Sequence, residues 1–220
     1  MSSAFVARLL LEALARGERC VKLQSMPLIE RSLAMRSVLD GVVRDDDKIC
    51  VEEPMRLALH ALRMGVPEKT VAAALDWRMF EEYVAWALEE AGFHVWRGLR
   101  VHGPGGFQVD ALGLDGYGRG VVVECKHWNP RVSSPSRLRE AARRHLERVR
   151  RLARYWHRLD LPRRRYRLVP LLLVLRETGL PRIIERVPVV PVSKLRGLIE
   201  ELDYVIDDPS VAVVETPGEG

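Results

Sequence analysis

Apolar residues recur at helical spacing along most of the first 75 residues of the chain. Residues three and four apart share a face of a helix, so this pattern predicts amphipathic helices. The helices expected from it cover residues 4–15, 28–39, 54–64 and 68–75. Between the second and third of these, the valine-rich stretch 42–51 predicts two short strands around an acidic turn. The first third of the chain is therefore expected to be a mainly helical module.

From residue 76 onwards, helical periodicity alternates with short apolar runs rich in β-branched residues. Asp76 is a suitable N-cap for the first helix, and Gly92 is a suitable end for it. The expected elements are helices at 78–91, 136–159 and 193–202, and strands at 93–96, 107–114, 120–127, 166–175 and 187–192. Their order, αβββαββα, predicts an α/β fold. We therefore expect a helical module at 1–75, an α/β domain at 76–205 and a tail at 206–220.

The turn Gly65-Val66-Pro67 joins two of the expected short helices, and it leaves two interpretations open. The pair could form a helix-turn-helix that reads DNA, and the hairpin ahead of it would then allow a winged-helix arrangement. Alternatively, the two helices only pack against their neighbours. The second helix carries a single basic residue, Lys69, which favours packing.

Charge is distributed unevenly along the chain. The formal net charge is +5 and the pI is about 9.4. The segment from His127 to Pro170 holds fourteen arginines and three acids, so it carries +11, whereas the rest of the chain carries −6. Such asymmetry is typical of a surface that binds a polyanion. An arginine-rich helix that is merely solvated is the alternative, and charge alone does not decide between the two.

Composition excludes several classes of protein. With 47% hydrophobic and 30% charged residues, the chain resembles an ordinary globular protein rather than a disordered one. No run approaches the ~18 consecutive apolar residues that a membrane span needs, so no membrane association is expected. Cys20, Cys50 and Cys125 lie far apart and are odd in number. This argues against a disulfide framework and a zinc ribbon, and it favours a reducing cytoplasm.

Three charged residues stand out in the expected hairpin of strands. Glu124 and Lys126 share one face of a strand, since alternate side chains point the same way, and the pairing of the strands brings Asp110 towards Glu124. Charged groups in so apolar a run are costly to bury unless they are paired or bind a metal. Two adjacent carboxylates repel each other without a cation, and oxygen ligands select Mg²⁺ or Mn²⁺. On the neighbouring long helix, His145 falls on the apolar face and is interpreted as a core histidine.

Asp110 followed by Glu124-x-Lys126 resembles the signature of the PD-(D/E)xK nucleases, with Val109-Asp110 where that family often has Pro-Asp. The resemblance is strongest to Mrr-like restriction endonucleases and archaeal Holliday-junction resolvases. It spans residues 76 to 202 and rests on Phe80-Glu81-Glu82-Tyr83, Gly92-Phe93, Gly105-Gly106-Phe107-Gln108-Val109-Asp110 and Glu124-Cys125-Lys126-His127-Trp128.

The resemblance implies a restriction-endonuclease-like fold, a mixed sheet flanked by helices, and hydrolysis of DNA phosphodiester bonds with Mg²⁺ or Mn²⁺. It assigns Asp110 and Glu124 to the metal and Lys126 to the attacking water. A helical glutamate completes the site in that family. Spacing to Gly92-Phe93 assigns this role to Glu81, with Glu82 as the alternative.

DNA is the expected partner, bound mainly through its backbone phosphates. The arginines expected to bind it are Arg131, Arg137, Arg143, Arg144, Arg148 and Arg151. The preferred interpretation is an Mrr-like, metal-dependent deoxyribonuclease. Two alternatives remain: a structure-selective Holliday-junction resolvase, which requires a homodimer, and a non-catalytic DNA-binding protein that retains the nuclease fold.

Overall fold

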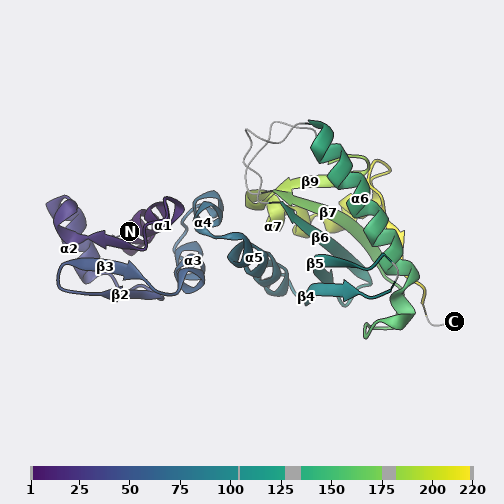
Figure 1. The fold of residues 1–220 in the computed structure, drawn as a ribbon, viewed down its shortest axis with the longest axis horizontal. Coiled ribbons are helices and arrows are strands. Elements are labelled where there is room, and N and C mark those ends of the chain that lie inside the picture. The colour runs from purple at the N-terminus through teal and green to yellow at the C-terminus, as the bar shows by residue number, and fades with distance from the viewer. Residues whose placement is uncertain (1, 104, 127–134, 175–181, 219–220) are drawn as a thin grey trace. The chain divides into compact units, whose positions relative to one another are not determined.

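The computed structural model describes residues 2–103, 105–126, 135–174 and 182–218. The chain divides into two compact units, Met1–Phe80 and Glu81–Gly220, and each is described by itself. Figure 1 labels the helices and strands of both. No helix in the described ranges combines the length and the apolar character needed to cross a membrane.

The first unit combines helices with a small antiparallel sheet. Its elements are α1 (Ser2–Ala15), β1 (Cys20–Lys22), the 3-10 helix η1 (Leu23–Ser25), α2 (Leu28–Arg36), β2 (Val42–Arg44), β3 (Lys48–Val51), α3 (Pro54–Arg63) and α4 (Glu68–Ala74). The strand order is β1-β3-β2. All four expected helices and both strands of the hairpin are present, whereas β1 was not expected. The winged-helix interpretation of this unit stays a prediction.

The junction between α3 and α4 follows from its sequence. Pro54 occupies the first turn of α3, where its missing N–H costs nothing. Leu57, Ala58 and Ala61 are buried along one face of this helix. Gly65 then adopts a φ of +81°, a left-handed conformation that glycine accepts without steric cost. This glycine ends the helix and turns the chain towards α4.

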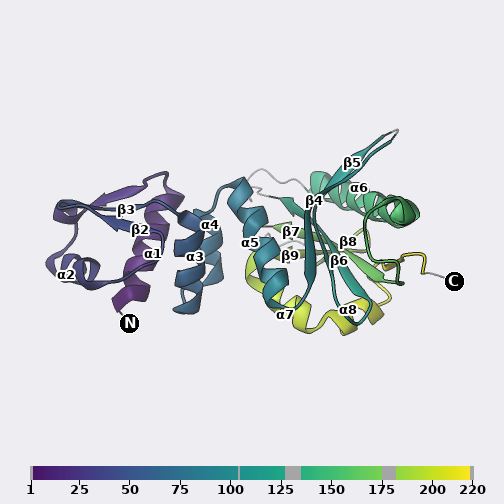
Figure 2. The same ribbon diagram turned by 90° about the horizontal axis from the view of Figure 1, so that it is seen from below.

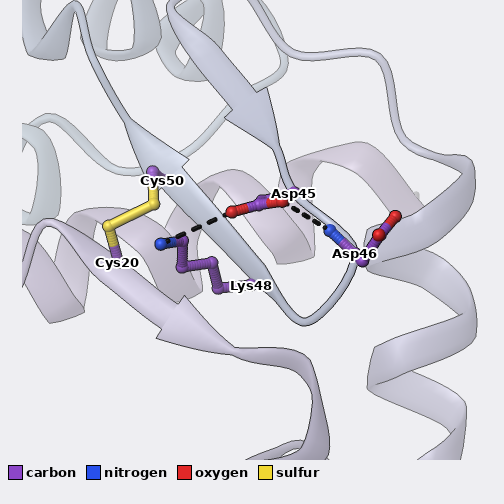
Figure 3. The surroundings of a disulfide bond; sticks show 5 residues. All are labelled: Cys20, Asp45, Asp46, Lys48 and Cys50. Atoms are coloured by element: carbon purple, nitrogen blue, oxygen red, sulfur yellow. Dashed lines mark hydrogen bonds and ion pairs between the residues drawn. A yellow bond between two sulfur atoms is a disulfide. The ribbon is translucent and has the colours of Figure 1, made fainter.

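A disulfide joins Cys20 on β1 to Cys50 on β3, two residues that lie directly opposite each other in the strand register. Figure 3 shows the bond near the side chain of Lys48 on the β2–β3 hairpin, whose Nζ lies 3.5 Å from a carboxylate oxygen of Asp45. The expectation that the cysteines form no disulfide is wrong. It rested on their spacing along the chain, which gives no information about strand pairing. The argument from cysteines to a reducing compartment loses its basis.

The second unit is built on a seven-stranded mixed sheet with the strand order β4-β5-β6-β7-β9-β8, and β10 pairs with β7. Its helices are α5 (Trp77–Glu90, which begins in the first unit), α6 (Pro135–Arg154), η2 (Trp156–Arg158), η3 (Val192–Lys194), α7 (Leu195–Glu200) and α8 (Leu202–Asp207). Its strands are β4 (His94–Val101), β5 (Phe107–Leu114), β6 (Arg119–Lys126), β7 (Arg167–Val174), β8 (Ile183–Ile184), β9 (Val187–Pro191) and β10 (Val214–Glu215). Strands β4, β5 and β6 are antiparallel, whereas β6, β7 and β9 are parallel. The expected α/β class with a mixed sheet flanked by helices is confirmed.

Helices cover both faces of this sheet. Figures 1 and 2 show α6 on one face and α5, α7 and α8 on the other. On the α6 face, Val122 belongs to the same buried cluster as Val149 and Leu152. On the opposite face, Gly113 lies against Leu88 of α5. The alternation of side chains along β6 therefore sends its even-numbered residues towards α6.

Residues 206–220, expected as a tail, contribute a strand to the sheet. Within them, β10 pairs with the beginning of β7. Thr216 is buried, its N–H donates to the Tyr166 carbonyl at 2.9 Å, and its hydroxyl accepts from the Tyr166 N–H at 2.8 Å. This reciprocal pair fixes the segment after α8 to the start of β7.

Candidate active site

Asp110 and Glu124 come from neighbouring antiparallel strands. Ala111 of β5 pairs with Val123 of β6, so the next positions along the two strands are Asp110 and Glu124. Both face α6, because they keep the parity of Val122. The Cys125 N–H donates to Asp110 Oδ2 at 2.7 Å and fixes that carboxylate at the edge of the β5–β6 pair.

Glu124 lies at the centre of a cluster of charges and is only 7% exposed. Lys126, two residues further along the same face of β6, donates from Nζ to Glu124 Oε1 at 2.6 Å. Arg148 of α6 donates to the other oxygen, Oε2, at 2.8 Å. Each oxygen of this buried carboxylate therefore accepts a hydrogen bond from a cation, the pairing that makes its burial tolerable.

The two carboxylates respond differently to these surroundings. Burial acts to raise the pKa of Glu124, but the Lys126 hydrogen bond and charge, together with the charge of Arg148, outweigh it and hold that pKa below its usual value. Burial raises the pKa of Asp110, and the nearby charge of Glu124 adds to this against the Cys125 hydrogen bond. Asp110 is thus the carboxylate whose charge the protein neutralises less completely.

His145 of α6 lies next to Glu124 as a buried, neutral side chain. It is fully inaccessible, and burial lowers its pKa to about 4. Its Nε2 lies 2.8 Å from the Val122 carbonyl oxygen. A neutral ring can only donate to a carbonyl, so Nε2 carries the proton. Nδ1 lies 3.9 Å from Glu124 Oε2 and, among the described residues, has no hydrogen-bond partner. His145 is a core histidine, as expected, but one that borders the acidic pair.

Glu81 lies on α5, which covers the sheet face opposite Glu124. Burial raises the pKa of the Cys125 thiol, and the charges of Asp110 and Glu81 raise it further, so Glu81 acts on this end of β6. Among the residues that the structure describes, no three His, Cys, Asp or Glu side chains gather closely enough to hold a metal ion. The structure therefore brings Asp110 and Glu124 together without adding Glu81 or Glu82 as a third ligand. Glu82 is exposed.

The arginines named from the sequence do not form one uniform surface. Arg131 lies outside the described residues. Arg143 and Arg144 are exposed and pair with acids, Arg143 with Glu185 at 2.9 Å and Arg144 with Glu140 at 3.4 Å.

Arg137 is exposed near the start of α6. Arg151 donates to the Gly105 carbonyl at 2.7 Å and lies over the Phe107 ring at 4.9 Å. The link from Arg148 to Glu124 was not foreseen; its only signal in the sequence is a helix position one turn after His145.

The donor set of this site suits a hard divalent cation. Asp110 and Glu124 offer only oxygen, which Mg²⁺ and Mn²⁺ prefer. The raised pKa of Asp110 shows that the half-buried carboxylate lacks full compensation, and a bound cation would supply it. Two protein carboxylates with the remaining positions left to water and substrate are typical of Mg²⁺ sites.

Residues 72–151 match the family model Mrr_cat, described as a restriction endonuclease. The resemblance to Mrr-like nucleases is confirmed for this segment, which contains Glu81, Asp110, Glu124 and Lys126. No curated protein matches the chain.

Two solved structures are similar to the chain. Protein VC1899 from Vibrio cholerae has 11% identity and a TM-score of 0.42, with 94% of this chain and 53% of that one covered. Can2 from Sulfobacillus thermosulfidooxidans, in complex with cyclic tetra-adenylate, has 10% identity and a TM-score of 0.33, with 91% and 51% covered. The chain spans about half the length of these proteins.

Proposed function

We propose that the unit Glu81–Gly220 is an Mrr-like endonuclease that hydrolyses DNA phosphodiester bonds and depends on Mg²⁺ or Mn²⁺. The observation that carries this proposal is the placement of Asp110 and Glu124 across one strand pair, with Lys126 bound to Glu124 on the same face. The match of residues 72–151 to a restriction-endonuclease family supports the same reaction class.

In this proposal, Asp110 and Glu124 hold the metal ion, and Glu81, which is not one of its ligands, orients a second water from α5. When bound, such an ion polarises the phosphate and lowers the pKa of the attacking water. Lys126 exchanges its bond to Glu124 for one to that water and orients it towards phosphorus. The Cys125 N–H keeps Asp110 in place throughout, because the bond uses the backbone.

Arginines of α6 are proposed to bind the DNA backbone. Arg137, Arg143, Arg144 and Arg151 lie on the solvent side or the flank of this helix. Contacts of this kind give affinity that falls steeply with salt and carry little sequence information. We propose a cytoplasmic location because the proposed substrate is DNA. The cysteines no longer support this location, since two of them form a disulfide.

One observation favours a second candidate, a non-catalytic DNA-binding protein. Lys126 and Arg148 together already satisfy both oxygens of Glu124. A site whose carboxylate is neutralised by two side chains can persist as a stable scaffold without a metal ion.

Cleavage assays separate the two candidates. Supercoiled plasmid and a four-way DNA junction are incubated with Mg²⁺ or Mn²⁺ and with the native chain, Asp110→Asn, Lys126→Ala or the control Lys194→Ala. The nuclease proposal expects metal-dependent cutting by the native chain and by Lys194→Ala, and loss of cutting in the other two variants. A preference for the junction would indicate a resolvase rather than a restriction-type enzyme. Binding without cutting by the native chain would favour the scaffold.

A further inference from the structure

An open cleft of about 1200 Å³ lies at the C-terminal end of α6, beyond the residues of that helix that border the candidate active site. One wall is formed by the last turn of α6 and by His157 of η2. The other wall is the segment leading into β7 together with β10 and the residues after it. Its lining residues are Arg150, Ala153, Arg154, His157, Arg164, Arg165, Val214, Glu215, Thr216, Pro217 and Gly218.

The lining is strongly basic. It contains four arginines and one glutamate, a formal charge of +3 with His157 neutral. Arg165 is paired with Glu215, and Arg150 lies 3.8 Å from Glu147. Arg154 has no carboxylate partner among the described residues. Its charge is therefore available to an anion in the cleft.

Arg164 likewise has no carboxylate partner in the part of the chain that the structure describes. Its guanidinium donates to the Gly116 carbonyl at 2.8 Å and lies over the Tyr166 ring at 5.5 Å. These contacts fix the position of the group without neutralising its charge. A cation held in place by a carbonyl and a ring is well suited to bind a phosphate oxygen.

This cleft is separate from the site at Glu124. Arg150 and Arg154 are spaced as i and i+4 and share one flank of α6, whereas Arg148 faces Glu124 from another flank. Along the sheet, Arg164 precedes β7, whose first residue pairs with the first residue of β6.

Lys126 is the last residue of β6, and seven residues of strand span about 23 Å. The two basic regions therefore lie at opposite ends of the β6–β7 pair.

We propose that this cleft binds backbone phosphates of the DNA substrate at a distance from the cut bond. The inference rests on the proposed function for the choice of substrate. Bound there, the DNA is anchored about seven base pairs from the scissile phosphate, since a duplex rises about 3.4 Å per base pair. The cleft contributes affinity and leaves the chemical step unchanged.

The lining favours a phosphate backbone over a free nucleotide. Apart from His157, it has no aromatic side chain on which a base could stack. Apart from the charged residues, His157 and the buried Thr216, the rest of the surface is Ala153, Val214, Pro217 and Gly218, whose side chains offer no hydrogen bond to the edge of a base. A surface of arginines without base contacts is the pattern expected for sequence-independent backbone binding.

The test measures DNA binding by fluorescence anisotropy in EDTA, so that it is independent of cleavage. The variant is Arg150→Gln with Arg154→Gln, two exposed helix positions at which glutamine preserves helix propensity. The matched control is Arg97→Gln with Arg182→Gln, two exposed positions outside the cleft. The probes are a 20-base-pair duplex, a hairpin with a six-base-pair stem, and ATP, each titrated at several salt concentrations.

A plot of log K against log salt has a negative slope for DNA binding. The proposal expects this slope, for the 20-base-pair duplex, to become shallower by about 1 to 2 in the cleft variant, because each lost phosphate contact removes about 0.9 from its magnitude. The control keeps the native slope. An unchanged slope in the cleft variant overturns the proposal, whether or not the chain cuts DNA. ATP binding that is lost in the cleft variant while duplex binding stays native would also overturn it, in favour of a nucleotide site. A native chain that binds DNA with the expected slope but does not cut it contradicts only the proposed nuclease.

Discussion

Arg148 lies 24 residues beyond Glu124 in sequence, yet its guanidinium donates to Glu124 Oε2 at 2.8 Å. This contact joins helix α6 to strand β6, which carries Glu124. It also means that Arg148 competes with any cation that Glu124 is to bind.

Replacing Arg148 by methionine should therefore strengthen metal binding. A charge-assisted hydrogen bond is worth about 1.5–3 kcal/mol, so its removal is expected to tighten Mn²⁺ binding by about tenfold or more. Isothermal titration calorimetry of the native and variant chains checks this. Weaker Mn²⁺ binding in the variant would show that Arg148 supports the metal site instead of competing for it.

Lys126→Ala should separate cutting from binding. Loss of a positioned group that acts on the attacking water is expected to lower the cleavage rate by about 10²–10⁴-fold. Affinity for DNA should stay within a few-fold, because the arginines of α6 are untouched. Single-turnover cleavage and anisotropy on the same preparation test both. An equal loss in Lys194→Ala would point to a general charge effect.

Asp110→Asn should abolish stabilisation by a divalent metal. A ligand at 100 times its dissociation constant stabilises a protein by about 2.7 kcal/mol, so Mg²⁺ or Mn²⁺ should raise the thermal midpoint of the native chain. The variant should not respond. Without metal, however, its midpoint should exceed the native one at pH 7, since the folded-state pKa of Asp110 is raised and ionisation there disfavours the fold. A variant that still responds to metal would remove Asp110 from the ligand set.

Acid should destabilise the second unit through His145. Its folded-state pKa of about 4 lies below the unfolded value of 6.5. The unfolded chain therefore binds the proton first, and stability falls as the pH drops from 6.5 to 4, by about 3 kcal/mol in all. Urea unfolding at intervals of half a pH unit measures this loss. It should shrink in His145→Gln and stay native in His102→Gln at an exposed position; an unchanged pH dependence in His145→Gln would contradict the assignment.

Reducing the disulfide between Cys20 and Cys50 should destabilise the first unit alone. The bond closes a separation of 30 residues, and a loop of that length is worth about 3–4 kcal/mol. Hydrogen exchange should quicken in β1 and β3 after reduction, with little change in β5 and β6. Cys125→Ala controls for the buried thiol. Faster exchange throughout the chain would show that the two units are energetically coupled.

In the second unit, the sequence pattern predicted the elements that depend on neighbouring residues alone, such as turns and hairpins. The hairpin of β5 and β6 was expected because a turn rich in glycine separates two apolar runs. The structure shows why it is stable: Asp115 accepts the Tyr117 and Arg119 N–H groups, and Gly118 has a φ of +84°. The expectation that Asp110, Glu124 and Lys126 share one face came from the same reasoning, since strand parity determines which side chains point the same way.

Contacts between distant segments could not be predicted in this way. The long helix was expected to reach residue 159, but α6 ends at Arg154. The chain continues as a 3-10 turn in which the Trp156 indole donates to the Pro162 carbonyl at 2.9 Å. The two-residue strand β10 is too short to show the alternation of apolar and polar residues by which a strand is recognised in a sequence. The Cys20–Cys50 bond depends on the register of strands that no local signal defines.

The short strand β10 also determines which edges of the sheet are open to other molecules. One edge of β7 pairs with β6, and the other is shared between β10 at its start and β9 at its end. A chain trimmed after α8 would leave the first residues of β7 with unpaired backbone groups, bordered by the apolar Leu168 and Val169. Exposed edges of this kind recruit strands from other molecules. Proteolytic removal of the last dozen residues should therefore make the protein aggregate more readily, although every helix that the structure describes is still present.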